Sequence, residues 1–343
     1  MQADDLPWIA QAAGDMDEPP RSAAERLVGE LHGAEATALL AGSGAAAGGA
    51  LTALTNPGGH VIVPAQLAGP VRDFVENDLA RMGREVSFTD CTDIAAVGAC
   101  LRPETQVVLT ESLSDPLMRP SPVNELAELA HAADLFLVVD NTALSPALLR
   151  PLDLGATLVV ERCSPYLDGR VGLDASVVAG PPRLVRRVAA QAARTGARLD
   201  PWSSELLAAS LRALALRMSA LQRNTREVAA FLRGHPGVAR VNLPDFDSAP
   251  WAAETHRGFG GLLSFEPRAP LVPATHDESV SLPARTSHAG LGARRRRAAG
   301  ISATLVRVAP GIEPPARLVG TLRGLLDAAR PAPPRVPEGT RHV

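Results

Sequence analysis

The segment LFLVVDNTALSPALLRPLDLGATLVVE (135–161) decides the fold that we expect. It begins and ends with apolar runs, 135–140 and 157–161, and the last residue of each run is acidic, Asp140 or Glu161. Short runs without polar interruption are typical of strands that are buried on both faces of a sheet. The segment therefore predicts two strands of a covered sheet, each with a carboxylate at its carboxyl end.

Working outward, three further apolar runs predict strands: HVIVP (60–64), EVSF (85–88) and QVVLTE (106–111). Helical patterns lie between them at 68–83 and 121–134. Strands that alternate with helices imply a mostly parallel α/β sheet. Because ligands of such sheets bind beyond the carboxyl ends of the strands, the site is expected within 111–116, 140–146 and 161–169.

The rest of the chain predicts a second, smaller domain. Residues 181–235 follow a helical pattern. The region after them contains three short strand patterns, which are followed by a final helix, 314–330. Ser22, followed by Glu25, predicts a capping box at the start of the first helix. We expect four parts, given by their ranges: an N-terminal arm (1–20), a large α/β domain (21–220), a small C-terminal α+β domain (221–330) and a Pro-rich tail (331–343).

The composition excludes several classes of protein. The chain has 343 residues and a formal net charge of -3, and all 34 of its Lys+Arg residues are arginine. Without lysine, a lysine Schiff base cannot form. The balanced charge argues against nucleic acid as a partner, and the run Arg294–Arg297 is interpreted as a solvated helix face.

Membrane, secretory and metal-binding signals are also missing from the sequence. No apolar stretch reaches the length of about 20 residues that spans a bilayer, and the first ten residues lack a signal-peptide core. Cys91, Cys100 and Cys163 have neither disulfide-framework nor zinc spacing. We therefore expect a cytoplasmic protein that has no metal site and does not bind a membrane.

Eight pieces of the chain, taken together and in order, resemble the Cys/Met-metabolism family of pyridoxal-phosphate (PLP) enzymes, which includes cystathionine γ-synthase, cystathionine lyases and methionine γ-lyase. The resemblance implies an aspartate-aminotransferase-like fold (PLP fold type I). The pieces are 42–64, ESLSDP (111–116), 138–161, YLDG (166–169), 196–218, 224–241, GFGGLLSF (258–265) and LVRVAPGIE (305–313).

The departures from that family concern the cofactor. The position of the lysine that forms the internal aldimine holds Pro165, which has no nucleophile. The residue that stacks on the PLP ring falls at Ala68, a phosphate-side serine falls at Arg162, and the asparagine beside the ring hydroxyl falls at Asp115. We therefore expect no covalently bound PLP, and we do not favour non-covalent binding of PLP or of a PLP–substrate adduct.

Other parts of the family's site are retained. The resemblance places Asp140 at the aspartate that pairs with the pyridine nitrogen, and Ser164 at the phosphate-contacting threonine. Ser43, Gly44 and Ala45 keep the small-residue turn whose backbone N–H groups face phosphate at a helix N-terminus. We interpret these residues as a remnant cofactor pocket.

The substrate-binding candidates are Arg307 and Arg162. The resemblance places Arg307 at the arginine that grips the substrate carboxylate, a role that the guanidinium fork suits; the alternative is a structural pair with Glu313 or Asp277. Arg162 either binds an anion or neutralises Asp115 or Asp140.

The candidates for acid–base catalysis are Asp115, Tyr166 and Asp140. Tyr166 is the only tyrosine, so it is either a general acid or simply a packed residue. Asp140 either contacts a ligand or caps the backbone of the next two residues. For Cys163 and His288 we favour burial and a structural role, respectively.

Two functions remain open. In the first, a repurposed enzyme binds and transforms a carboxylate-bearing, amino-acid-derived molecule without internal-aldimine chemistry, in a specialised biosynthetic pathway. In the second, a catalytically inactive subunit pairs with, or regulates, an active paralogue. The expected assembly is a homodimer or tetramer in the first case and a heteromer in the second.

Overall fold

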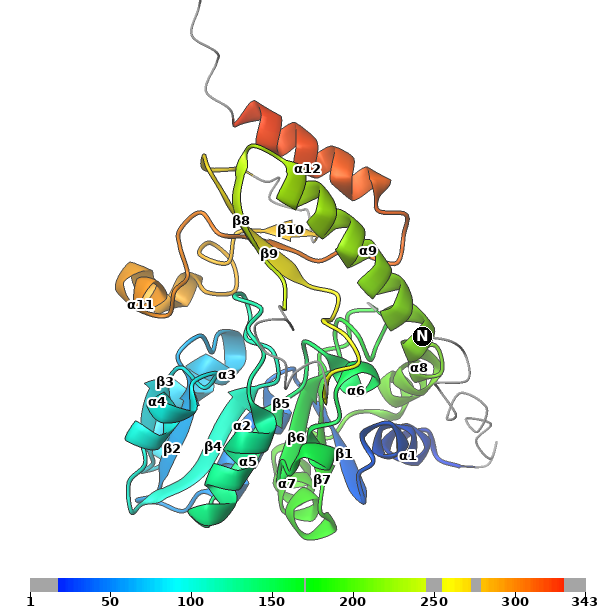
Figure 1. The fold of residues 1–343 in the computed structure, drawn as a ribbon. Coiled ribbons are helices and arrows are strands. Elements are labelled where there is room, and N and C mark those ends of the chain that lie inside the picture. Colours follow the sequence, from blue (N-terminus) through cyan, green and yellow to red (C-terminus); the bar gives the residue numbers. More distant parts are fainter. Residues whose placement is uncertain (1–17, 170, 245–254, 273–278, 330–343) are drawn as a thin grey trace, which may run out of the picture.

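The computed structural model describes residues 18–169, 171–244, 255–272 and 279–329. Most of the predicted N-terminal arm and the whole predicted tail lie outside these residues. Figure 1 shows a large sheet with helices on both sides and a smaller sheet above it. The fold-class prediction of an α/β large domain with a smaller α+β domain is confirmed.

Seven strands form the large sheet, in the order β1-β7-β6-β5-β4-β2-β3. The run from β3 to β6 is parallel, while β7 is antiparallel to both β6 and β1. The bounds of the strands are β1 Ala36–Ala41, β2 His60–Pro64, β3 Glu85–Thr89, β4 Thr105–Glu111, β5 Phe136–Asp140, β6 Leu158–Arg162 and β7 Ala175–Gly180.

The helices cover the two faces of this sheet in different groups. Alternate strand residues separate the faces: Val138 and Val160 belong to the cluster beneath α2 and α7, whereas Val139 belongs to the cluster beneath α5. The helices of the large domain are α1 Pro20–His32, α2 Ala45–Leu54, α3 Gly69–Asp73 followed by a π-helical turn Phe74–Leu79, α4 Ile94–Ala99, α5 Val123–Ala132, α6 Ser145–Leu148, a 3₁₀ turn Pro151–Leu154, α7 Pro182–Thr195 and α8 Pro201–Leu211.

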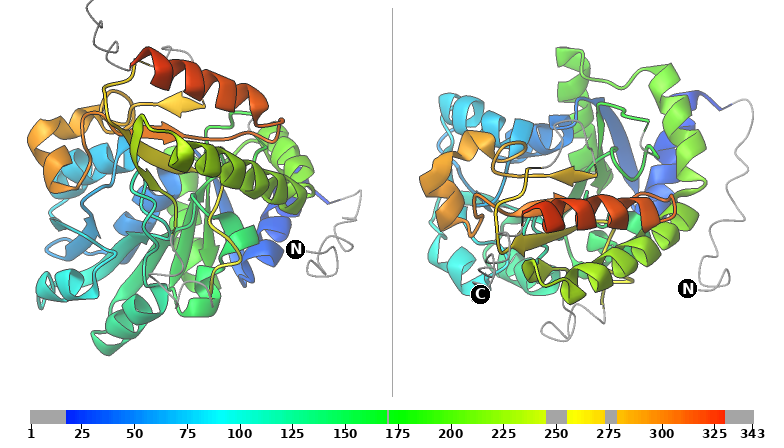
Figure 2. Two further views of the ribbon diagram at one scale, coloured as in Figure 1. Left: turned by 45° about the horizontal axis from the view of Figure 1, so that its top comes forward. Right: turned by 90° about the horizontal axis from the view of Figure 1, so that it is seen from above.

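The small domain packs two helices on a second sheet, in the strand order β10-β11-β9-β8, and all of its pairings are antiparallel. Seen from above, α12 lies across this sheet beside α9 (Figure 2). The elements are α9 Leu214–Gly234, β8 Val238–Asn242, β9 Leu263–Pro267, β10 Val280–Ser281, a 3₁₀ turn Ala289–Leu291, α11 Gly292–Ala298, β11 Val306–Val308 and α12 Ala316–Ala328.

Helix α9 joins the two domains. Its first half buries Leu214, Met218 and Leu221 in the core of the large domain, and its second half buries Val228 and Leu232 in the core of the small one. The domain boundary that we predicted between residues 220 and 221 therefore falls inside a continuous helix.

The capping-box prediction at Ser22 was wrong, whereas the helix predicted over 68–83 is present. Helix α1 begins at Pro20 and has no side-chain cap. Proline fits the first helical turn because the N–H that it lacks would have no partner within the helix there. Ser22 lies inside the helix. The helix predicted over 68–83 starts at Gly69 and changes to π-helical geometry at Phe74.

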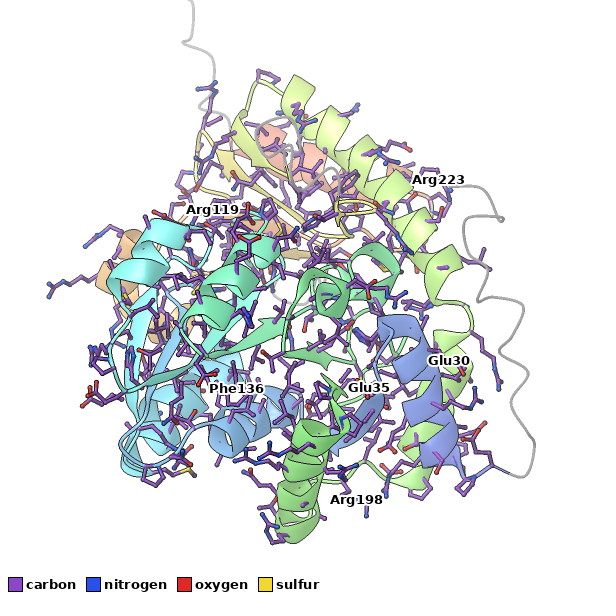
Figure 3. The ribbon with its side chains drawn as sticks, turned by 60° about the horizontal axis from the view of Figure 1, so that its bottom comes forward. Glu30, Glu35, Arg119, Phe136, Arg198 and Arg223 are labelled. Atoms are coloured by element: carbon purple, nitrogen blue, oxygen red, sulfur yellow. The ribbon has the colours of Figure 1, made fainter. Side chains whose placement is uncertain are left out.

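The charged side chains that face away from both cores lie at the surface. Figure 3 shows three of them: Glu30 on α1, Arg198 between α7 and α8, and Arg223 on α9. The run Arg294–Arg297 is on α11, which buries no residue; the prediction of a solvated helix face is confirmed there.

Candidate functional site

A small pocket lies at the carboxyl edge of β4, β5 and β6, the place that the parallel strands predict. Its volume is about 130 Å³, well below the roughly 300–1,000 Å³ typical of small-molecule sites. The lining residues come from both domains: Ser43, Gly44, Gln66, Leu67, Ala68, Gly69, Pro70, Val71, Glu111, Asp115, Asp140, Arg162, Ser287, His288 and Arg307.

Two acidic residues lie next to each other at the sheet edge. Glu111 ends β4 and is directly opposite Asp140, which ends β5. Burial is the largest cause that raises the pKa of Glu111 well above its ordinary value, and the negative charges of Asp140 and Asp115 raise it further. Burial therefore favours the neutral, protonated form of Glu111, and its Oε2 has no hydrogen-bond partner among the described residues. A neutral carboxylic acid can donate a proton.

The predicted substrate arginine is already paired. Arg307 of β11 contacts Asp115, which lies after β4, with 2.6 Å between Nη1 and Oδ2. The side chains are 23% and 18% exposed. A structural pair therefore forms, but with Asp115 rather than with Glu313; Asp277 lies outside the described residues. A ligand carboxylate reaches this guanidinium fully only by displacing Asp115.

The side chain of Asp140 caps the backbone that follows its strand. Its Oδ1 accepts hydrogen bonds from the backbone N–H of Thr142, at 2.9 Å, and from the Thr142 hydroxyl. That hydroxyl in turn accepts from the backbone N–H of Arg162, at 2.9 Å. The local capping that we considered as an alternative is thus present, although Asp140 also lines the pocket.

Arg162 is the last residue of β6 and is exposed on the pocket side. Within the described ranges, its guanidinium makes no hydrogen bond or ion pair. It does not neutralise Asp115, whose partner is Arg307. An unpaired guanidinium in a concave site is suited to binding an anion.

The turn before α2 contributes Ser43 and Gly44 to the pocket. The backbone N–H of Ser43 donates to Oδ1 of Asp174, at 2.7 Å, so this donor is already used within the chain. Ala45, the first residue of α2, does not line the pocket.

Two other predicted site residues also lie elsewhere. Tyr166 is 1% exposed in the core of the large domain, and its hydroxyl accepts a hydrogen bond from the backbone N–H of Gly261, at 3.1 Å. Neither Tyr166 nor Ser164 is among the lining residues. Cys163 is buried, as expected, and burial raises the pKa of its thiol well above the ordinary value.

Our sequence analysis missed Glu111 and Gln66 and treated His288 as structural. The position of Glu111 at the end of a buried strand was the available signal. His288 is buried, and its Nε2 lies 3.0 Å from the carbonyl oxygen of Gln66. A carbonyl only accepts, so Nε2 carries the proton and Nδ1 faces Ser287. Burial lowers the pKa of His288 in spite of the nearby Asp115 carboxylate.

The described ranges contain neither a candidate metal cluster nor a helix that could span a membrane. No group of three or more His, Cys, Asp or Glu side chains there could hold a metal ion. None of the helices in those ranges is long and apolar enough to cross a membrane.

Comparisons with known proteins agree with the fold. Residues 14–276 match the model of a family described as "Cys/Met metabolism PLP-dependent enzyme". The chain is 33% identical over 315 residues to cystathionine gamma-lyase of Bacillus subtilis, with 86% of this chain and 83% of that protein covered. It is 34% identical over 333 residues to cystathionine gamma-synthase of Escherichia coli, with 91% and 86% covered.

Solved structures give the same result. Cystathionine gamma-lyase from Lactobacillus plantarum, complexed with L-serine, superposes with a TM-score of 0.83 at 29% identity, over 91% of this chain and 86% of that one. Cystathionine gamma synthase from Xanthomonas oryzae pv. oryzae, in complex with aminoacrylate and cysteine, gives 0.83 at 27% identity, over 93% and 87%.

These matches contradict our prediction about the cofactor. We expected no covalently bound PLP, but the matching family is PLP-dependent; PLP is therefore the cofactor that family membership implies. The pocket fits PLP only in part. Ser43, Gly44 and Asp140 line it, yet the Ser43 amide is bonded to Asp174 and Asp140 is bonded to Thr142. The Ser43 amide would therefore have to exchange partners before it could contact PLP.

Proposed function

The chain belongs to the Cys/Met metabolism family of PLP-dependent enzymes. From this premise we propose that it binds and transforms a carboxylate-bearing, amino-acid-derived molecule at the carboxyl edge of β4, β5 and β6. We call this the altered edge, because its residues depart from the family's pattern. The unpaired guanidinium of Arg162 is the single observation that carries the proposal. It lines the pocket beyond β6, where it is the natural contact for a ligand carboxylate.

The altered edge also supports a departure from the family's usual chemistry. The sequence contains no lysine, and the resemblance places Pro165 where the family's Schiff-base lysine stands. The acid–base role accordingly goes to pocket carboxyl groups. Glu111, whose protonated form burial favours, is the proton donor, and Asp140 beside it is the acceptor. Tyr166 has no part in this proposal, because its hydroxyl is held in the core.

Arg307 is a second contact for the ligand, but the ligand reaches it only by displacing Asp115. When a ligand carboxylate enters, it replaces the carboxylate of Asp115 at the guanidinium of Arg307. Such an exchange makes binding weaker than at a free arginine, since one charge-assisted hydrogen bond is lost for each one formed. The assembly that we propose with this function is a cytoplasmic homodimer or tetramer.

Calorimetric titration tests the proposal. L-cystathionine, L-cysteine and L-serine are titrated into the full chain with and without PLP. We expect saturable binding of at least one of them to the wild type. Arg162→Gln should weaken this binding about tenfold or more, because a charged hydrogen bond is lost. Arg162→Lys should restore part of the lost affinity. Arg186→Gln on α7, outside the pocket, is the matched control. Equal affinities in the wild type and Arg162→Gln would refute the proposal.

A second candidate function is favoured by one observation. The Arg307–Asp115 ion pair occupies the group that would hold a substrate carboxylate, as expected of an inactive subunit that supports an active paralogue. In that case the isolated chain binds none of the three amino acids, and it becomes soluble or stable only when it is co-expressed with the paralogue. A soluble homo-oligomer that binds a ligand would exclude this alternative.

A further inference from the structure

A second and larger cavity lies beside the candidate site, between the two domains. Its volume is about 740 Å³, within the roughly 300–1,000 Å³ range of small-molecule sites. One wall follows the ends of β2 and β3 together with α11, and the other is formed by β8. Gln66 lines both this cleft and the candidate site and so separates them.

Arginine is the dominant charged residue of the cleft. Four guanidiniums line it, against two carboxylates. Arg119 pairs with Asp90, at 2.9 Å, while Arg72 and Arg295 share the single carboxylate of Glu76, each at 2.8 Å. The fourth lining arginine is Arg240.

Arg240 adds a further positive charge to the cleft. Its side chain makes no hydrogen bond or ion pair within the part of the chain that the structure describes. Arg240 and Asn242 are two residues apart on β8, and both line the cleft, because alternate strand residues face the same side. Among the residues that line the cleft, four arginines and two carboxylates leave a net charge of +2; Glu266 on β9, the register partner of Arg240, does not line it.

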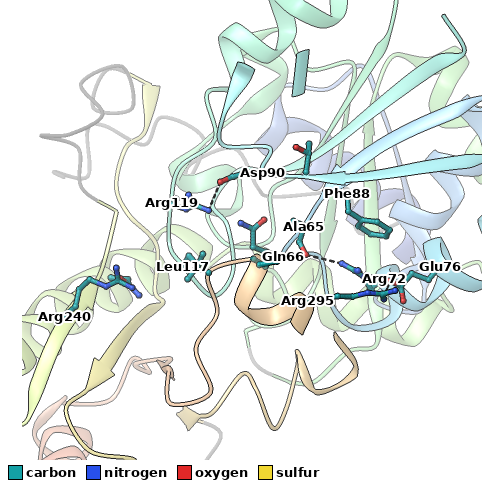
Figure 4. A pocket seen from close by; sticks show the side chains of 15 residues that line it. Ala65, Gln66, Arg72, Glu76, Phe88, Asp90, Leu117, Arg119, Arg240 and Arg295 are labelled. Carbon is teal, nitrogen blue, oxygen red and sulfur yellow. Dashed lines mark hydrogen bonds and ion pairs between the residues drawn. The ribbon is translucent and has the colours of Figure 1, made fainter. Parts of the chain in front are cut away.

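The opposite wall is held rigidly. Arg72 is 6% exposed, its Nη1 donates to the carbonyl oxygen of Ala65 at 3.1 Å, and its guanidinium carbon lies 3.9 Å from the centre of the Phe88 ring. In the view of Figure 4, Arg72, Arg295 and Glu76 lie on one side of the cavity and Arg240 lies on the other. Fixed donors bind an anion without first losing side-chain freedom.

We propose that this cleft is a second binding site, which takes a small phosphate monoester. A phosphate monoester carries about two negative charges near pH 7, which matches the two unbalanced arginines. Leu117, Ala298 and Ala299 provide apolar surface for the organic part of the ester. The proposal does not depend on the function of the candidate site.

Titration of phenyl phosphate into the full chain tests the proposal. Arg240→Gln should weaken binding about tenfold or more, through loss of a charge-assisted hydrogen bond. Arg294→Gln is the matched control, because Arg294 precedes a lining residue on α11 but does not line the cleft; it should leave the affinity unchanged. Phenyl sulfate, of similar shape but with one negative charge, and inorganic phosphate, which lacks the ring, should each bind several-fold more weakly.

A measurement on the wild type alone gives an independent check. Lowering the pH through the second phosphate pKa of about 6 removes one ligand charge while arginine stays protonated, so the affinity should fall with the pH. The proposal is overturned if phenyl phosphate does not bind, if Arg240→Gln binds as tightly as the wild type, or if phenyl sulfate or inorganic phosphate binds equally well. It is also overturned if Arg162→Gln, rather than Arg240→Gln, abolishes binding, since the ester then occupies the candidate site.

Discussion

The interior of the large sheet and its carboxyl edge are made by the same strands, but they differ in how their side chains are satisfied. Inside, residues such as Leu109 and Val138 are buried among apolar neighbours. At the edge, partly buried ionisable groups lie close together: the pKa of Glu111 is raised, and Asp115 is paired to Arg307.

A second pair of ionisable groups lies near the end of β6. Glu161 lies 3.2 Å from Nε2 of His32, and both side chains are fully buried. Burial raises the pKa of Glu161 and lowers that of His32 to about 3, so burial favours the neutral form of both groups. Packing thus specifies the interior, whereas the edge can change its chemistry while the fold is retained.

The largest expected effect concerns the interior. Leu109→Ala removes a side chain that is 1% exposed and should lower the free energy of unfolding by about 2–5 kcal/mol, because a cavity remains. Urea denaturation measures this change. Leu216→Ala, at a position that is 68% exposed, is the control and should change stability by less than about 0.5 kcal/mol. An equal decrease in the free energy of unfolding of the two variants would contradict the distinction between a packed interior and a tolerant surface.

The next prediction concerns the ion pair at the edge. Asp115→Asn removes the carboxylate that holds Arg307, so the affinity for L-cystathionine should rise about tenfold, the worth of one charge-assisted hydrogen bond. Asp153→Asn, which breaks an exposed pair with Arg150, should have no such effect. Weaker binding by Asp115→Asn would show that Asp115 supports the site instead of competing with the ligand.

The smallest expected effect comes from Glu111. Its folded pKa is raised above the ordinary 4.5, so the folded state retains this proton after the unfolded state has lost it, and stability falls as the pH rises above 4.5. Glu111→Gln removes this dependence and should therefore raise the free energy of unfolding at pH 8.

The gain from Glu111→Gln should shrink as the pH falls toward 4.5. Denaturation at several pH values measures it, and the exposed Glu227→Gln on α9 is the control. A gain that does not vary with pH would show that Glu111 is ionised in the folded protein.

Local pattern was enough to predict the parallel part of the sheet. The β-branched runs of β2, β4, β5 and β6 lie within a residue or two of their predicted ranges, since such residues fit buried strands at every position. β1, ATALLA, and β7, ASVVAG, were not predicted as strands, because runs rich in alanine do not separate strand from helix.

The site was less predictable, because its contacts join distant parts of the chain. Asp115 and Arg307 are 192 residues apart, and nothing near either residue in the sequence shows that they pair. Tyr166, the only tyrosine, was considered either a general acid or a packed residue, and its hydroxyl accepts a hydrogen bond from Gly261 in the core. The strand ends located the pocket, whereas tertiary packing decides which side chains enter it.

The most direct test of the altered edge is a crystal structure of the protein with L-cystathionine. The account predicts a ligand carboxylate within hydrogen-bonding distance of the Arg162 guanidinium, in the pocket that Glu111 and Asp140 line. A ligand carboxylate bound elsewhere, with the Arg162 side chain in solvent or paired to a residue of the chain, would contradict it.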